Sequence, residues 1–138
     1  MYEAIQLEQV IEQLIEQKTG IRECTFNQID KNLTIIATNL NLQKPYYLNR
    51  HNTPDLAISR AIRMSIAYPV MITPVLYQGD LFGDGGEAIS YPITIFDQEL
   101  DETIGITIAS HNENKDYHLT KRRFQRFGLF LNKWTNLK

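Results

Sequence analysis

Residues 75–86 read Val-Leu-Tyr-Gln-Gly-Asp-Leu-Phe-Gly-Asp-Gly-Gly, an apolar segment that ends in three glycines around one carboxylate, Asp84. Glycine adopts backbone angles that other residues avoid, so such a run predicts a tight, closely packed turn. The sequence therefore predicts an acid at the rim of a sheet, on a turn shaped by Gly83, Gly85 and Gly86, where α/β folds carry their working residues. A common Asp-Gly hairpin turn is the simpler interpretation of the same residues.

The composition is that of one globular domain over residues 1–138, with 43% hydrophobic and 22% charged residues. The net charge of −2 gives no indication of a nucleic-acid partner. Residues 115–138 carry seven basic residues and one acid on an otherwise acidic chain, which favours internal pairing or an anionic surface as partner. Cys24 is the only cysteine, so we expect no internal disulfide and a reducing, cytoplasmic compartment.

Periodicity predicts a first helix over residues 4–17 that ends near Gly20. Its apolar face is expected to hold four residues at helical spacing, Leu7, Val10, Ile11 and Leu14. Residues 33–38 are β-branched and apolar, as in a strand covered on both faces, and residues 45–48 form a second extended segment.

A second helix is expected to begin at Thr53-Pro54-Asp55, which combine a capping hydroxyl, a first-turn proline and an acid. Pro69 should end it, because the residue before a proline avoids helical angles. Gln78-Gly79 predicts a small hairpin between residues 75–77 and 80–82.

The C-terminal part is expected to hold a buried strand at residues 104–109 and a helix at residues 120–134. The helix has an aromatic stripe and a basic back that includes Lys121-Arg122-Arg123. That pattern favours a core-packing helix or, alternatively, peripheral contact with a membrane. Strands alternating with helices predict an α/β layered fold.

Four segments in this order resemble the patatin-like phospholipase family: residues 33–40 (LTIIATNL), 52–56 (NTPDL), 61–69 (AIRMSIAYP) and 79–86 (GDLFGDGG). The resemblance implies an α/β fold, a partial three-layer sandwich with a mainly parallel sheet flanked by helices. It also implies hydrolysis of phospholipid or acyl-lipid esters by a Ser-Asp dyad, without a cofactor. By the resemblance, Asp84 would be the proton acceptor.

The family's Gly-x-Ser-x-Gly elbow is absent, since no serine of the chain has glycine two residues before it: Ser59, Ser65, Ser90 and Ser110. Only Gly20 precedes residue 79, so the glycine-rich oxyanion loop is absent as well. A base without nucleophile and oxyanion donors does not hydrolyse esters alone. We therefore expect this chain to be the aspartate-bearing C-terminal portion of such a domain, which is incomplete on its own. The alternative is a non-catalytic lipid- or protein-binding module, or a degenerate fragment of the family.

The expected partners are phospholipid or acyl lipid and a chain that carries the missing N-terminal half. Losing the early strands would expose a sheet edge, which favours homo-oligomers. His51, His111 and His118 could join a serine in a triad, but ordinary surface histidines are the simpler interpretation. No metal site is expected, because His111 and His118 lack a second ligand at recognisable spacing. Cys24 has no paired base in sequence, which predicts a buried or inert thiol.

Overall fold

The computed structural model describes residues 4–92, 95, 104 and 106, and the chain divides into two units, Met1–Ala88 and Ile89–Lys138. The elements of the first unit are, in order, α1 (Ile5–Thr19), η1 (Phe26–Gln28), β1 (Thr34–Asn39), β2 (Lys44–Asn49), α2 (Ile58–Ser65), β3 (Val75–Tyr77), β4 (Asp80–Asp84) and η2 (Gly85–Glu87). In the second unit, the Ile95 amide donates a hydrogen bond to the Pro92 carbonyl at 3.2 Å.

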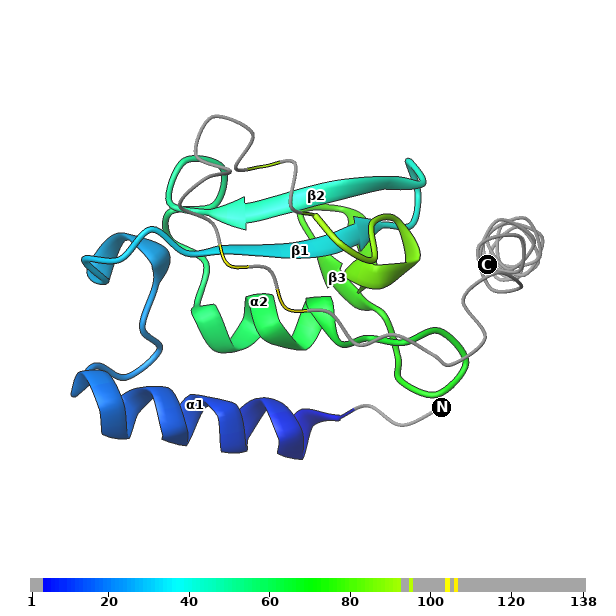
Figure 1. The fold of residues 1–138 in the computed structure, drawn as a ribbon. Coiled ribbons are helices and arrows are strands. Elements are labelled where there is room, and N and C mark those ends of the chain that lie inside the picture. Colours follow the sequence, from blue (N-terminus) through cyan, green and yellow to red (C-terminus); the bar gives the residue numbers. More distant parts are fainter. Residues whose placement is uncertain (1–3, 93–94, 96–103, 105, 107–138) are drawn as a thin grey trace. The chain divides into compact units, whose positions relative to one another are not determined.

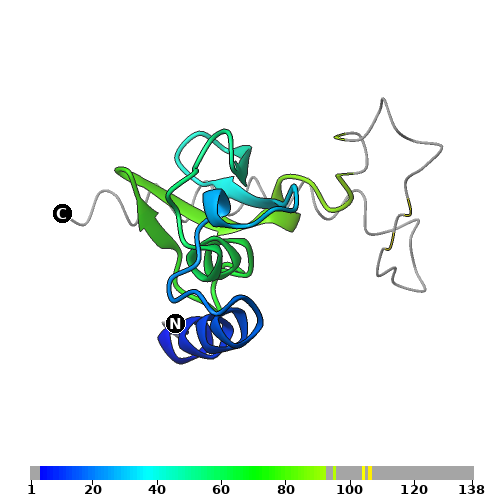
Figure 2. The same cartoon turned by 90° about the vertical axis from the view of Figure 1, so that its left-hand side faces the viewer.

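The four strands form one sheet in the order β2-β1-β4-β3, and every neighbouring pair is antiparallel. The predicted mainly parallel sheet, flanked by helices in a three-layer sandwich, is therefore wrong. Four residues join β1 to β2 and two join β3 to β4, and connections this short cannot make the crossover that parallel strands require. In the first unit, α2 packs against one face of the sheet and α1 packs against α2 on that same side (Figure 1, Figure 2).

The hairpin predicted at Gln78-Gly79 is confirmed. Both residues have positive φ angles, 50° and 89°, as a two-residue turn between right-twisted strands requires. The first helix also ends where its glycine predicts. Gly20 has a φ of 73°, and its amide donates to the Glu16 carbonyl at 2.7 Å.

The second helix begins later than predicted, at Ile58 instead of at Thr53-Pro54-Asp55. The preceding segment pairs with the chain that follows α1, so its backbone groups are already used. The Asn27 amide donates to the Pro54 carbonyl at 3.1 Å, and the Ile58 amide donates to the Cys24 carbonyl at 2.8 Å. The helix ends at Ser65, four residues before the proline that was expected to end it.

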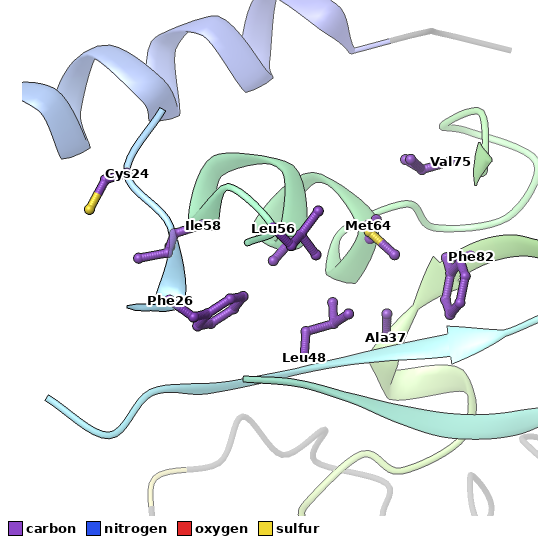
Figure 3. Packing of buried hydrophobic residues seen from close by; sticks show 10 residues of the cluster. Cys24, Phe26, Ala37, Leu48, Leu56, Ile58, Met64, Val75 and Phe82 are labelled. Atoms are coloured by element: carbon purple, nitrogen blue, oxygen red, sulfur yellow. The ribbon is translucent and has the colours of Figure 1, made fainter. Parts of the chain in front are cut away.

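The core of the first unit fills the space between α2 and the sheet (Figure 3). The Phe82 ring packs edge-on against the rings of Tyr46 and Tyr77, with centroids 5.3 and 6.1 Å away. The buried residues of this core are Cys24, Phe26, Ala37, Leu48, Leu56, Ile58, Ala61, Met64, Val75 and Phe82. The predicted burial of the Cys24 thiol is thus confirmed, and the cysteine is free.

The predictions for the C-terminal part fall mostly outside the described residues. This holds for the helix at residues 120–134 and for most of the strand at residues 104–109. Ile104 and Ile106 are the two described residues of that strand. They are 91% and 88% exposed and lie in no strand, so the expected burial is wrong at these two positions.

Candidate active site

Asp84 is the last residue of β4 and lies opposite Ala37 of the central strand β1. Its backbone is held from two sides. The Asp84 amide donates to the Ala67 carbonyl at 3.0 Å, just beyond the end of α2, and the Asp84 carbonyl accepts a hydrogen bond from the buried Thr38 hydroxyl at 2.6 Å. These two bonds fix the point at which the side chain leaves the sheet.

The carboxylate of Asp84 caps the short helix η2. Its Oδ1 accepts a hydrogen bond from the Gly86 amide at 2.6 Å. Among the described residues, no other group donates a hydrogen bond to the side chain. One carboxylate oxygen is thus anchored, and the second accepts no hydrogen bond among the described residues.

Partial burial sets the electrostatics of this carboxylate. Desolvation raises the pKa of Asp84 above its ordinary value of 3.8, and the hydrogen bond from the Gly86 amide offsets part of that rise. A carboxylate with a raised pKa holds a proton more tightly, so it is a stronger base near neutral pH than an exposed aspartate.

Close packing around the turn requires its glycines, and unusual backbone angles do not. Among the described glycines, only Gly20 and Gly79 have a positive φ. A Cβ on Gly85 would overlap the Ile36 carbonyl oxygen and lie 2.8 Å from the carbonyl carbon. A Cβ on Gly83 would lie 3.1 Å from a methyl group of Leu40.

Gly86 has a different neighbour, because a Cβ there would lie 2.9 Å from the Asp84 Oδ1 atom that its own amide binds. Absence of a side chain therefore lets the turn press onto β1 and lets the carboxylate fold back onto η2. The glycine run predicts a turn shaped by unusual backbone angles, whereas close contacts with neighbouring atoms shape it instead.

A groove elsewhere in the first unit does not include Asp84. Its volume is about 1260 Å³, and it lies between α1, residues 52–60 and the β3–β4 turn. Charged side chains such as Glu12, Arg22 and Arg60 line it. Among the described residues, no three His, Cys, Asp or Glu side chains come together in a group that could hold a metal ion.

Comparison with known proteins identifies the family. The family model described as Patatin-like phospholipase matches residues 3–97, which include Asp84 and its glycine turn. The chain belongs to the patatin-like phospholipase family. The resemblance drawn from the four sequence segments is thereby confirmed.

Two viral relatives are much longer than this patatin-like chain. The Uncharacterized protein R571 of Acanthamoeba polyphaga mimivirus is 57% identical over 122 residues, which cover 88% of this chain and 41% of the relative. The Probable lipid hydrolase 463L of Invertebrate iridescent virus 6 is 29% identical over 70 residues, or 51% of this chain and 24% of the relative. The chain thus spans less than half the length of the relatives that it matches.

The described serines do not complete a dyad within the patatin-like chain. Ser59 is buried in α2, Ser65 is the last residue of that helix, and Ser90 is exposed. None of the three donates a hydrogen bond to Asp84 among the described residues. His51 is exposed in the turn after β2, whereas Ser110, His111 and His118 lie outside the described residues.

Sequence reasoning missed two groups that hold Asp84, the Thr38 hydroxyl and the Ala67 carbonyl. Thr38 is 46 residues from Asp84 in sequence, so no local spacing links them. Both groups lie in segments quoted for the family resemblance. The order of those segments was the one sequence signal that could have placed Thr38 and Ala67 near the aspartate.

Proposed function

We propose that this chain supplies the general base, Asp84, of a patatin-like lipid acyl hydrolase. In this proposal the serine nucleophile comes from a part of the domain that lies outside these 138 residues. The observation that carries the proposal is the state of the Asp84 carboxylate. One oxygen is anchored by the Gly86 amide, the other accepts no hydrogen bond among the described residues, and burial raises the pKa of the group.

The chemistry follows from that arrangement. The free oxygen of Asp84 accepts the proton of a serine hydroxyl as the serine oxygen attacks the carbonyl carbon of the ester. The leaving alcohol takes up the proton as the bond between carbon and alkoxy oxygen breaks. Water then attacks the acyl-serine, with Asp84 again as base, and releases the fatty acid and the free serine.

An apolar segment beside Asp84 supports a lipid ester as the substrate. Ala67, whose carbonyl holds the Asp84 amide, leads into a loop with exposed apolar side chains. Val70 is 69% exposed and Met71 is 67% exposed. Val70 also has a φ of 76°, an unusual angle for a β-branched residue. Strained backbone of this kind clusters at functional sites, and this segment follows directly after the Ala67 carbonyl that binds Asp84. No helix in the described part of the chain is long and apolar enough to cross a membrane.

The test is reconstitution of phospholipid hydrolysis. The 138-residue chain is assayed alone and after mixing with a second polypeptide, the part of the mimivirus relative that this chain does not match. The proposal places the serine in that second polypeptide. We expect hydrolysis only in the mixture.

The Asp84→Asn variant should lower the rate of the mixture by about 10²–10⁴-fold, the usual contribution of a general base. The matched control is Asp30→Asn, which makes the same change at an exposed carboxylate and should leave the rate unchanged. Equal rates for the wild-type and Asp84→Asn mixtures would show that the base has been assigned to the wrong residue.

A further inference from the structure

The loop between α2 and β3 carries an apolar turn at its tip. The loop passes beyond the last turn of α2 before it enters β3 (Figure 1). The Ile72 amide donates a hydrogen bond to the Tyr68 carbonyl at 2.9 Å, and this bond closes the turn. Pro69 is buried within the turn, whereas Val70 and Met71 are 69% and 67% exposed. We call Val70 and Met71 the turn tip.

Folding alone does not account for a valine at position 70. Its φ is 76°, and a turn with proline followed by a residue of positive φ normally has glycine or asparagine at the second position. A β-branched residue is strained at such an angle. Burial gives no compensation, since most of the side chain is exposed. A strained and exposed apolar side chain indicates a contact with another molecule.

The base of the loop is held on both sides. The guanidinium of Arg63, a buried residue of α2, donates to the Thr73 carbonyl at 2.8 Å. The Ala67 carbonyl accepts a hydrogen bond from the Asp84 amide at 3.0 Å. Val70 follows Ala67 by only three residues, so a molecule that contacts the turn tip is brought close to the backbone of Asp84.

The charges of this segment favour a neutral lipid surface as the occupant of the turn tip. Residues 64–79 contain no charged side chain, and Arg63, which precedes them, is only 4% exposed. The segment therefore offers no exposed cation to an anionic lipid or to an acidic protein surface. Binding at a membrane interface grows with the apolar area that is buried there, so it can proceed without ion pairs.

The size of the turn tip argues against a protein as the occupant. Each partner in a stable protein complex contributes ~800 Å² of surface, which two side chains cannot supply. A lipid surface requires no matching area, because apolar side chains enter the boundary between head groups and acyl chains directly. A small projecting apolar tip beside a site for lipid esters fits that partner.

We propose that the turn tip inserts into the surface of zwitterionic lipid and docks the Asp84 site against it. This inference rests on the proposed function, in which a lipid ester must reach Asp84. It adds the kind of surface that is bound and the residues that bind it. Val70 and Met71 enter the lipid, and the hydrogen bond between Ala67 and Asp84 ties the carboxylate-bearing strand to the inserted loop.

The experiment measures partition into vesicles and not hydrolysis. The 138-residue chain is sedimented with phosphatidylcholine vesicles at ~0.1 M and ~1 M salt, between which the screening length falls from ~10 to ~3 Å. The test variant is Val70→Gly/Met71→Gln. Glycine accepts the positive φ, so the thermal midpoint should not fall, and lost partition then does not reflect unfolding. The control, Leu42→Gln, changes a leucine that is 63% exposed in the turn between β1 and β2.

We expect the double variant to partition at least ~10-fold more weakly than the wild type, because two apolar side chains no longer leave water. The control should partition within about twofold of the wild type, and the higher salt concentration should not weaken partition of either protein.

Four results would overturn the inference. The wild type fails to partition into phosphatidylcholine, or the double variant partitions as well as the wild type. Partition requires anionic lipid and disappears at ~1 M salt, which would place the contact on basic residues elsewhere. The wild type forms a homodimer that the double variant dissociates, which would make a second copy the occupant.

Asp84→Asn separates this inference from the proposed function, since it should partition as the wild type does. If mixtures with Asp84→Asn hydrolyse lipid at the full rate while the double variant loses partition, the lipid contact survives and the proposed base does not. If the double variant partitions normally while Asp84→Asn abolishes hydrolysis, the base survives and the lipid contact does not.

Discussion

Replacing Gly85 by alanine tests how closely the glycine turn presses on the sheet. The new Cβ would overlap the Ile36 carbonyl oxygen and lie 2.8 Å from the carbonyl carbon, whereas carbon atoms in contact are normally about 3.5–4.0 Å apart. Ile36 cannot yield alone, because β1 is paired with β2 on one side and with β4 on the other. Either η2 moves away by roughly 1 Å, or both strand pairs are distorted.

Overpacking of this kind costs about 1–3 kcal/mol, and a collision with the backbone of a central strand belongs at the upper end. We therefore expect Gly85→Ala to lower the free energy of unfolding by about 3 kcal/mol, a large part of the ~5–15 kcal/mol of an ordinary domain. At ~4–8 °C per kcal/mol for a unit of this size, the thermal midpoint should fall by about 12–24 °C.

Urea unfolding followed by circular dichroism measures this loss, and Gly86→Ala is the matched control. Neither glycine has a positive φ, and at position 86 the nearest atom is the movable end of the Asp84 side chain. The control should therefore lose less than about 1 kcal/mol. If Gly85→Ala lowers the free energy of unfolding no more than Gly86→Ala does, the turn does not pack closely against β1.

Three further predictions concern single interactions. Asp84→Asn should raise the free energy of unfolding at pH 7 and reduce its dependence on pH. Folding raises the pKa of the Asp84 carboxyl, so this group lowers the stability of the folded protein as pH rises from the unfolded pKa through the folded one. Urea unfolding at pH 4 and pH 7 checks this. Thr38→Val should cost about 1–2 kcal/mol, since the Asp84 carbonyl loses its donor, and calorimetric melting measures it. Glu8→Gln should change stability by less than about 1 kcal/mol in the same assay, as expected of a partly exposed ion pair.

Local signals in the sequence predicted local features well. Gln78-Gly79 predicted the hairpin and Gly20 predicted the end of α1, because both depend on backbone angles that neighbouring residues decide. Asp84 lies at the end of β4, as predicted for an acid at the rim of a sheet. In each case the physical cause lies within a few residues of the sequence signal.

Features that depend on distant segments were predicted wrongly. Thr53-Pro54-Asp55 has the local form of a helix start, but the carbonyl of Cys24 and the amide of Asn27 bind the segment that follows Thr53. The apolar period of α1 predicted which residues share a face, but not that Glu8 and Glu12 would take the inner side. The mainly parallel sheet was implied by the family resemblance, whereas the short β1–β2 and β3–β4 connections favour antiparallel pairs.

The sequence singled out a candidate aspartate but not the geometry around it. Ordered motifs singled out Asp84 and its glycines, and the family match over residues 3–97 supports that choice of segment. The anchoring of one carboxylate oxygen by the Gly86 amide and the hydrogen bond from Thr38 depend on coordinates. The proposed role of the aspartate therefore needs a measurement on the serine itself.

The most direct measurement is the rate at which a fluorophosphonate labels the proposed serine in the mixture of this chain with the unmatched part of the mimivirus relative. Fluorophosphonates react with a serine that a nearby base activates, so labelling reports proton transfer without any lipid substrate. We predict rapid labelling of the partner polypeptide by the wild-type mixture and labelling at least ~100-fold slower with Asp84→Asn. Equal labelling rates with aspartate and asparagine at position 84 would contradict the assignment of Asp84 as the base.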